Sequence, residues 1–386
     1  MKSIAIITTH PIQYNAPWFK MLAERDNVKV KVFYTWGQLE SDKKFDPGFG
    51  KEVKWDIPLL EVYEYSFIKN IAKEPGSHHF KGIDNPTLIK EIEDWNPDAL
   101  LVFGWSFKSH LKVLRHFKGR RKILFRGDSN LLDEPGGFSI KKIARKIFLK
   151  WIYSHVDVAL YVGSANKAYY LKYGLEEKQL AFAPHAIDNE RFEAGVESGL
   201  RSHLGIPGAG VVFLFAGKLE QKKDPQLLLD AFIEMDDPDA YLVMAGNGML
   251  ENTLKQRVNA LTGALQSRIH FTGFKNQQAM PAVYKTADVL VLPSKGPGET
   301  WGLTVNEAMA SGRAVLISDK CGCYTDLVQE GRNGYIFKGS NRQDLAAKMK
   351  MIMGHRSELP AMGRASAEII SDWNYSRICE AIENII

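Results

Sequence analysis

Cysteine is scarce in this sequence of 386 residues, which contains only Cys321, Cys323 and Cys379. Three cysteines are too few, and too odd in number, for a disulfide framework, so a reducing compartment such as the cytosol is favoured. Cys321 and Cys323 form a Cys-x-Cys pair without a histidine cluster nearby, and this spacing is not typical of zinc sites. We therefore expect neither structural disulfides nor a bound metal.

Long apolar runs are also missing, since none approaches the ~20 residues that a membrane-spanning helix needs. Near the start, Thr-Thr-His-Pro interrupts the apolar run from Ile4 to Ile7, which favours a buried strand over a signal peptide. The net charge of +5 is mild. It suits phosphorylated ligands or an anionic membrane surface, but it is not the clustered basicity of a nucleic-acid binder. We expect a cytoplasmic protein without a nucleic-acid partner.

What is present is a regular alternation of short apolar runs with segments of helical spacing. The runs SIAIIT, VKVKVFYT and DALLVFG come first, and the rhythm restarts after Arg201 with VVFLFAG. Continuous apolar strands between helices predict parallel sheets that are covered on both faces. We place two α/β domains at residues 1–190 and 191–370. A final helix, 371–386, either packs on the second domain or crosses back to the first.

Lysines follow the first strand of the second domain in the stretch FAGKLEQKKDP. Ligands of open α/β sheets bind beyond the carboxyl ends of the strands. Gly217 permits a sharp turn and a close backbone approach there. Lys218, Lys222 and Lys223 then supply positive charge that would suit a diphosphate. The alternative is an ordinary solvated loop before a helix.

Two glutamates lie around an expected helix start in the stretch GETWGLTVNEAMASG. The helix would begin at Gly302-Leu303-Thr304, where free backbone N–H groups and the helix dipole favour a phosphate. Glu307, in the first turns, would reach two ribose hydroxyls, and Glu299, in the preceding loop, would reach sugar hydroxyls. The alternatives are a glutamate that merely stabilises the helix start and a solvated loop residue.

Two further turns follow strands of the second domain. Gly246 belongs to AGNGML, and Phe274 belongs to TGFKN, whose backbone would read the edge of a nucleobase. Any plain β-to-α turn has a similar composition, so these two signals are weak alone.

In the first domain, the strand ends TTHPIQYNAP and LFRGDSNLLDEPGG are the expected ligand contacts. His10 and Gln13 lie at the ligand edge in the first of these stretches, and Arg126 and Asp128 directly follow a strand in the second. The alternative for His10 is a structural turn histidine.

The stretch from Phe138 to His155 has basic residues among apolar ones, and positions 140, 143, 147 and 151 share one helical stripe. A basic amphipathic helix can lie on an anionic membrane. The favoured interpretation at this point is an ordinary domain helix with a solvated lysine face.

Taken together, these residues resemble the retaining GT-B glycosyltransferases, and family 4 in particular. That family carries P-S-x-x-E-G-x-G-L-x-x-x-E-A-x-A-x-G, which this chain matches from Pro293 to Gly312 with KGPG before Glu299. FAGKLEQKKDP is similar to the family's donor-phosphate segment, with Lys218 in the arginine place and Lys223 in the lysine place. VQEGRNGYIF and APHAIDNERF resemble two further segments of the family.

The resemblance implies two Rossmann-like domains facing across a cleft, with the final helix returning to the first. It implies that a nucleotide-sugar donor binds the second domain without an essential metal or other cofactor. Lys218 and Lys223 would hold the departing diphosphate, Glu307 the ribose and Glu299 the donor sugar. Asp128 would contact the donor sugar or aid the acceptor, and His10, Gln13 and Arg126 would contact the acceptor.

The leading hypothesis is a hexosyltransferase-type enzyme that transfers a sugar to a glycan or lipid-linked acceptor, in cell-surface polysaccharide synthesis. It would act in the cytoplasm, or at the inner face of the plasma membrane as a peripheral protein. The alternatives are a nucleotide-sugar 2-epimerase of the same fold and a non-catalytic nucleotide-sugar-binding subunit. The sequence does not identify the base, the sugar or the linkage.

Overall fold

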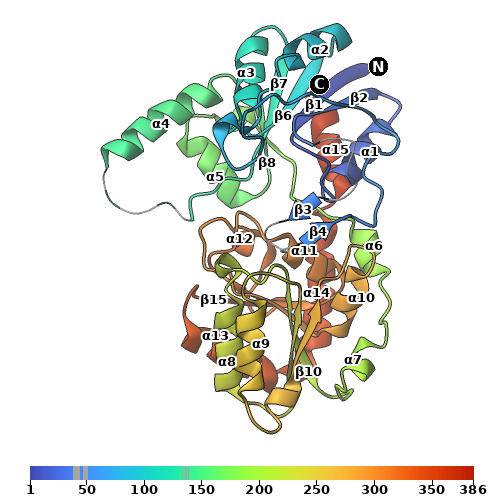
Figure 1. The fold of residues 1–386 in the computed structure, drawn as a ribbon, viewed down its shortest axis with the longest axis vertical. Coiled ribbons are helices and arrows are strands. Elements are labelled where there is room, and N and C mark those ends of the chain that lie inside the picture. The colour runs from blue at the N-terminus through green and yellow to red at the C-terminus, as the bar shows by residue number, and fades with distance from the viewer. Residues whose placement is uncertain (38–43, 47–50, 133, 135–136, 138) are drawn as a thin grey trace. The chain divides into compact units, whose positions relative to one another are not determined.

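The chain is described by a computed structural model that places residues 1–37, 44–46, 51–132, 134, 137 and 139–386, with backbone alone at 44–46 and 51–53. These residues form two compact units (Figure 1). Unit 1 contains the described residues of 1–42, 58–185 and 375–386, and unit 2 contains those of 43–57 and 186–374. Apart from the short segment 43–57, the chain enters unit 2 after His185 and returns to unit 1 after Asn374.

Unit 1 is built on a sheet of seven parallel strands among its described residues, in the order β5-β2-β1-β6-β7-β8-β9. The strands are β1 (Lys2–Thr8), β2 (Val28–Tyr34), β5 (Glu64–Phe67), β6 (Ala99–Phe103), β7 (Lys122–Arg126), β8 (Val158–Tyr161) and β9 (Leu180–Phe182). The order of the strands reverses between β1 and β6. This reversal is the position where open α/β sheets bind ligands.

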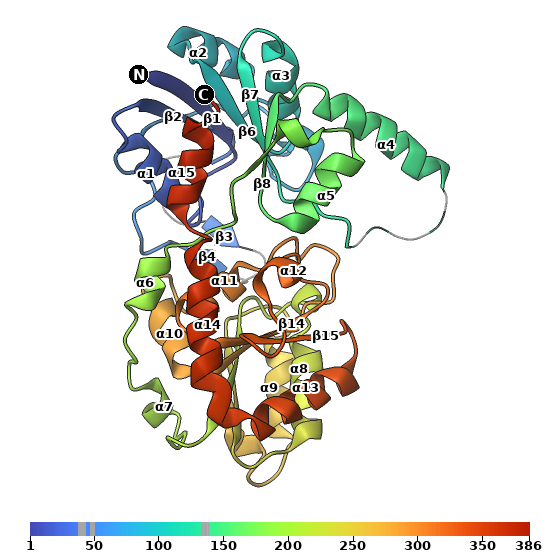
Figure 2. The ribbon, with the colours of Figure 1, turned by 180° about the vertical axis from the view of Figure 1, so that it is seen from behind.

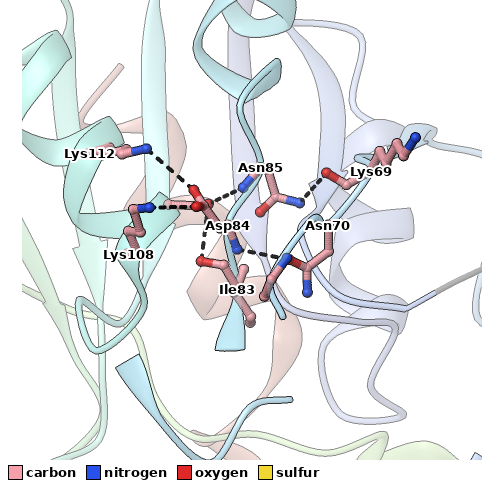
Figure 3. Close-up of polar contacts among 9 residues, drawn as sticks. Lys69, Asn70, Ile83, Asp84, Asn85, Lys108 and Lys112 are labelled. Carbon is pink, nitrogen blue, oxygen red and sulfur yellow. Dashed lines mark hydrogen bonds and ion pairs between the residues drawn. The ribbon is translucent and has the colours of Figure 1, made fainter. Parts of the chain in front are cut away.

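Helices cover both faces of this sheet because its central strands are apolar on both sides. The helices are α1 (Ala16–Ala23), α2 (Leu88–Trp95), α3 (Lys108–Phe117), α4 (Ile140–Tyr153), α5 (Ser164–Lys172) and α15 (Tyr375–Glu383). Ala5 and Ile7 of β1 pack with side chains of α2, α3, α4 and α5 in one core. On the other face, α1 and α15 lie side by side (Figure 2).

Unit 2 has six parallel strands among the residues described, in the order β12-β11-β10-β13-β14-β15. The strands are β10 (Val211–Ala216), β11 (Ala240–Ala245), β12 (Ile269–Gly273), β13 (Val289–Leu292), β14 (Ala314–Ser318) and β15 (Gly334–Phe337). Counted within the unit, this is the 3-2-1-4-5-6 order of the Rossmann fold. The reversal falls between β10 and β13.

The helices of unit 2 again lie on both faces of its sheet. They are α6 (Asn189–Glu193), α7 (Leu200–His203), α8 (Pro225–Met235), α9 (Glu251–Asn259), α10 (Met280–Thr286), α11 (Leu303–Ala310), α12 (Tyr324–Leu327), α13 (Arg342–Gly354) and α14 (Leu359–Ser371). Phe213 and Phe215 of β10 pack with side chains of α8, α9 and α13. On the other face, α11 and α14 pack together against β14.

A short segment between β2 and β5 groups with unit 2, although the surrounding chain belongs to unit 1. It contains the antiparallel pair β3 (Lys44–Asp46) and β4 (Lys51–Val53). After β4, the Lys54 carbonyl accepts a 2.7 Å hydrogen bond from Asn276, and Asp56 accepts one from the backbone N–H of Gln278. The sequence analysis, which assigned all of 1–190 to one domain, did not anticipate this segment.

The predicted fold class is confirmed: both units are parallel α/β domains of the Rossmann type. The final helix α15 belongs to unit 1, as the family resemblance implied. The predicted cleft between the domains stays a prediction. Among the helices described, none combines the length and the apolar character that crossing a membrane requires.

Candidate functional site

The loops after β10 and β13 meet at the strand-order reversal of unit 2. The two strands pair in parallel through Phe213–Val289 and Leu214–Leu290, so their carboxyl ends are neighbours. The loops that follow are joined by a 3.0 Å hydrogen bond from the Lys295 N–H to the Lys222 carbonyl. The structure therefore brings the predicted lysine loop and the predicted glutamate loop together at the ligand edge of the sheet.

At this junction, Lys223 and Glu299 form a partly buried ion pair. Lys223 Nζ lies 2.5 Å from Glu299 Oε2, and the two side chains are only 13% and 9% exposed. The hydroxyl of Ser294 donates a 2.9 Å hydrogen bond to the same carboxylate oxygen. Taking two charges out of water is tolerated when each is paired and hydrogen-bonded. One cation and one anion are therefore held together beyond the carboxyl ends of β10 and β13.

Lys222 and Lys218 lie differently from Lys223. The Lys222 side chain is 45% exposed and lies 3.5 Å from Glu220, also at the surface of the loop. Lys218 is half-buried, directly after Gly217. Of the three predicted lysines, Lys223 is the one that the structure pairs with a predicted glutamate.

Glycines let the loops after β10 and β11 pack backbone against backbone. Gly246 has φ +143°, and a Cβ added there would lie 1.9 Å from the carbonyl oxygen of Gly217. The Gly217 N–H donates to the Ala245 carbonyl at 2.9 Å, so the two loops continue the ladder of the strands. Any side chain at position 246 would push the lysine loop away from its neighbour.

The predicted helix start is confirmed, since α11 begins at Leu303 after Gly302, whose φ is +107°. A Cβ at Gly302 would lie 2.9 Å from Leu292 Cδ2, so a glycine fits this close approach to β13. No side chain caps the helix. Thr304 Oγ1 is buried and has no hydrogen-bond partner among the residues that the structure describes. An anion is the ligand that such a helix start favours, and the threonine hydroxyl would donate to it.

Glu307 is 2% exposed in α11, and Glu299, for which the alternative was a solvated loop residue, is 7% exposed. The hydroxyl of Tyr284, from α10, donates a 2.6 Å hydrogen bond to Glu307 Oε2. A carboxylate inside a mostly buried helix is expensive unless hydrogen bonds compensate for the lost water. Tyr284 therefore anchors the carboxylate near the helix start, about one turn into α11.

The loop that carries Glu299 is held in place by contacts that sequence reasoning missed. The backbone of Glu299 accepts a 3.0 Å hydrogen bond from the Gly322 N–H. Trp301 is 3% exposed, its indole N–H donates to Asn306 at 2.9 Å, and its ring packs on Trp373 at 5.1 Å. The sequence showed Trp301 beside a glutamate, but nothing in it placed Trp373 there.

The remaining predicted residues of unit 2 lie at the far side of the same edge. The Gly246 N–H donates to the Gly273 carbonyl at 2.9 Å, and Phe274 follows in a half-buried loop after β12. The nucleobase contact of Phe274 stays a prediction.

In unit 1, His10 and Gln13 follow β1 at the strand-order reversal. His10 Nδ1 lies 3.0 Å from Thr9 Oγ1, and its imidazole meets the Trp36 ring edge-on at 5.4 Å. Gln13 is half-buried in the turn that leads to α1. Their acceptor contacts stay predictions.

Arg126 and Asp128 have different surroundings: Arg126 is the last residue of β7, and not the first after it as predicted, whereas Asp128 lies in the loop that follows. Arg126 is 4% exposed and donates to the carbonyls of Ala183 and Pro184 at 2.7 and 2.9 Å. Its burial lowers the pKa of the guanidinium to about 10. The Asp128 side chain is 50% exposed and lies 3.9 Å from His185 Nε2. Arg126 is thus held by hydrogen bonds to the segment before unit 2, whereas Asp128 is accessible to solvent. The acceptor roles of both residues stay predictions.

His185 is a neighbour of Asp128 that the site prediction omitted. Burial, and then the nearby Arg126 charge, lower the pKa of its imidazole to about 4. A neutral histidine beside an accessible carboxylate is therefore present in unit 1 at neutral pH. Across the part of the chain that the structure describes, no three His, Cys, Asp or Glu side chains are grouped so that they could hold a metal.

Comparison with known proteins identifies relatives of this chain, and the family match lies within unit 2. Residues 198–368 match the family described as "Glycosyl transferases group 1". The D-inositol 3-phosphate glycosyltransferase of Geodermatophilus obscurus is 29% identical over 208 residues, which cover 52% of this chain and 46% of the relative. The mannosylfructose-phosphate synthase of Agrobacterium fabrum is 29% identical over 217 residues, again 52% of this chain and 46% of the relative. The match spans about half the length of these curated relatives.

A solved structure extends the similarity in fold to the whole chain. The crystal structure of HepE from Anabaena in complex with UDP has a TM-score of 0.73 and 18% sequence identity, and the alignment covers 100% of this chain and 99% of HepE. The two chains therefore share their fold.

Proposed function

From the match of residues 198–368 to the group 1 glycosyl transferase family, we propose that this chain is a retaining, metal-independent hexosyltransferase that uses a nucleotide-sugar donor. The observation that carries the proposal is the pairing of Lys223 with Glu299 at the strand-order reversal of unit 2. That edge also has the start of α11 and the buried carboxylate of Glu307. Cations, free amides and a carboxylate at one sheet edge suit a diphosphate, a ribose and a sugar.

The residues at this edge would then contact different parts of the donor. Lys218 and Lys223 would neutralise the diphosphate as the bond between its oxygen and the anomeric carbon breaks. The N–H groups at Leu303 and Thr304 would hold a phosphate, and Thr304 Oγ1 would find there the partner that it lacks. Glu307 would accept from the ribose hydroxyls.

At the sugar, Glu299 would accept hydrogen bonds from hydroxyl groups while remaining close to Lys223. The acceptor oxygen would form its new bond on the face from which the diphosphate leaves, so the anomeric configuration is kept. The proton of the acceptor hydroxyl would pass to the departing phosphate. Asp128 would assist from unit 1, and His10, Gln13 and Arg126 would contact the acceptor.

For the acceptor, we propose a glycan or a lipid-linked sugar in cell-surface polysaccharide synthesis at the inner face of the plasma membrane. UDP in the HepE crystal structure supports a nucleoside diphosphate as the leaving group. The D-inositol 3-phosphate glycosyltransferase and the mannosylfructose-phosphate synthase are named for different products, so the sugar and the acceptor are to be determined by experiment.

The test is to incubate the protein with a panel of nucleotide sugars, with and without candidate acceptors, and to follow nucleotide release and the fate of the sugar. We expect acceptor-dependent release of a nucleoside diphosphate and a product with the donor's anomeric configuration. Release of a free epimer of the sugar would contradict this proposal and indicate a 2-epimerase. Tight binding of a nucleotide sugar without turnover would contradict it and indicate a binding subunit. Absence of both binding and turnover across the panel would contradict all three functions.

A further inference from the structure

Helix α4 of unit 1 contacts its own unit mainly through its C-terminal half. Leu149, Ile152 and Tyr153 are buried in the core of unit 1. The preceding turns extend away from the rest of the unit (Figures 1 and 2). Phe138, where the sequence analysis began this helix, lies outside the described residues.

The apolar stripe recognised in the sequence is the exposed face of α4. Ile140, Ile143 and Ile147 are 79%, 44% and 65% exposed, and Trp151 is 41% exposed. At ~100° per residue, these four positions share one side of the helix, opposite to Leu149. As the favoured interpretation expected, α4 packs on its domain and exposes most of its lysines, but its apolar stripe is exposed as well and not buried in the core.

Trp151, at the end of the stripe, and its neighbour Phe148 contact other residues of unit 1, whereas the three isoleucines are exposed. The Arg115 guanidinium lies 5.7 Å from the Trp151 ring, and Phe148 meets the Trp105 ring at 5.5 Å. We call Ile140, Ile143 and Ile147 the α4 patch. Large aliphatic side chains gathered on one exposed surface are characteristic of a binding site.

The charge of α4 indicates the kind of surface that would cover the patch. Residues 140–153 contain Lys141, Lys142, Arg145, Lys146 and Lys150 but no aspartate or glutamate. Arg145 lies 3.7 Å from Glu134, and Lys142 donates to the Gly137 carbonyl. Lys141, Lys146 and Lys150 are exposed beside the patch. An apolar face bordered by cations matches the acyl chains and headgroups of an anionic bilayer.

We propose that α4 binds the surface of an anionic phospholipid membrane, with the α4 patch inserted among the acyl chains and the lysines at the phosphates. A second copy of this chain fits the helix less well, because an isologous contact would bring two rows of cations together without an acid in either helix. The helix is too short to span a bilayer and would lie in the interface. This inference is independent of the donor site in unit 2.

The test is co-sedimentation of the full chain with vesicles of phosphatidylcholine alone and of equal parts phosphatidylcholine and phosphatidylglycerol. We expect binding to the anionic vesicles and little to the neutral ones. Ile143→Glu/Ile147→Glu and Lys146→Glu/Lys150→Glu should each reduce the partition coefficient by about tenfold or more. Circular dichroism melting checks that the variants fold.

Matched controls place the same changes at exposed positions outside α4. Ile71→Glu/Val196→Glu replaces residues that are 53% and 77% exposed, and Lys90→Glu/Lys178→Glu replaces lysines whose side chains are 75% and 80% exposed. Both controls should bind anionic vesicles almost as wild type does. No binding by the wild type, or equal losses in the controls, would overturn the proposal. So would a stable dimer that Ile143→Glu/Ile147→Glu dissociates, since the second copy would then be the occupant.

Discussion

Lys222 and Lys223 are neighbours in sequence, but they face different surroundings. Lys223 pairs with the buried Glu299, whereas the Lys222 side chain is 45% exposed. The sequence predicted a cationic loop, and the family resemblance singled out Lys223. Composition alone could not separate the two lysines, because the short 3₁₀ turn Gln221–Lys223 decides which side chain points inward.

The first prediction follows from this difference. Lys223→Ala should lower kcat by about 100-fold or more, because it removes a cation that would neutralise the departing diphosphate. Lys222→Ala, the adjacent control, should change kcat by less than about threefold, as exposed ion pairs contribute little. Steady-state kinetics with the donor identified from the panel measures both. Similar losses in the two variants would remove Lys223 from the proposed mechanism.

His110 of α3 gives unit 1 a predictable response to acid. It is fully buried, with Nε2 2.8 Å from Thr35 Oγ1 and Nδ1 2.7 Å from the Phe103 carbonyl, and burial lowers its pKa to about 4. An unfolded histidine titrates near ~6.5. Between these values the unfolded chain binds a proton that the folded chain does not. Stability should therefore be complete above pH ~6.5 and fall by about 3 kcal/mol towards pH 4.

The measurement is the free energy of unfolding of the full chain by urea at several pH values across this window. His110→Gln should reduce the slope, with a part remaining because the pKa of His185 is also lowered to about 4, whereas His78→Gln, at an exposed position, should leave it unchanged. An unaltered slope in His110→Gln would show that other groups cause the acid sensitivity.

At the scale of elements, the predicted strands recur in the structure because their apolar runs are buried on both faces. The pattern could not show which side of an amphipathic helix packs on the protein. The apolar side of a helix usually faces the core, but in α4 the stripe with Ile140, Ile143 and Ile147 is exposed. It also could not show the segment containing β3 and β4, because its position rests on backbone contacts at Asn276 and Gln278.

The site itself was predictable in part. Glycines, lysines and glutamates at strand ends were visible as a pattern, and the structure brings Lys223 and Glu299 together. Tyr284 and Trp373 were not visible as site residues, because a tyrosine or tryptophan in an apolar segment is equally typical of the core. Such supporting contacts depend on the tertiary arrangement and not on local spacing.

The contact between the loops after β10 and β11 gives an element-scale prediction. Gly246→Ala places a Cβ 1.9 Å from the Gly217 carbonyl oxygen at φ +143°. This strain should cost about 3 kcal/mol or more and lower the melting temperature of unit 2 by roughly 6–12 °C. Gly208→Ala is the control, since no atom lies within 4 Å of an added Cβ there. Calorimetry that finds equal effects would contradict the backbone contact.

At the scale of the molecule, unit 2 contains the chain from Ala186 to Asn374 together with the short segment 43–57, and unit 1 contains the rest. The proposed donor residues, Lys223, Glu299 and Glu307 among them, all lie in unit 2, and the proposed acceptor residues in unit 1. Donor binding can therefore be measured without knowing the acceptor. This separation makes nucleotide binding the simplest test of the central claim.

The decisive measurement is calorimetric titration of the full chain with a panel of nucleoside diphosphates. One of them should bind wild type and Lys222→Ala alike. Its affinity should be about 10- to 100-fold weaker for Glu307→Gln and Glu307→Ala, because the ribose hydroxyls lose a charged acceptor. Glu307→Gln keeps an oxygen that can accept from Tyr284, so it separates this loss from misfolding. The account is contradicted if no nucleoside diphosphate binds, or if both Glu307 variants bind as tightly as wild type.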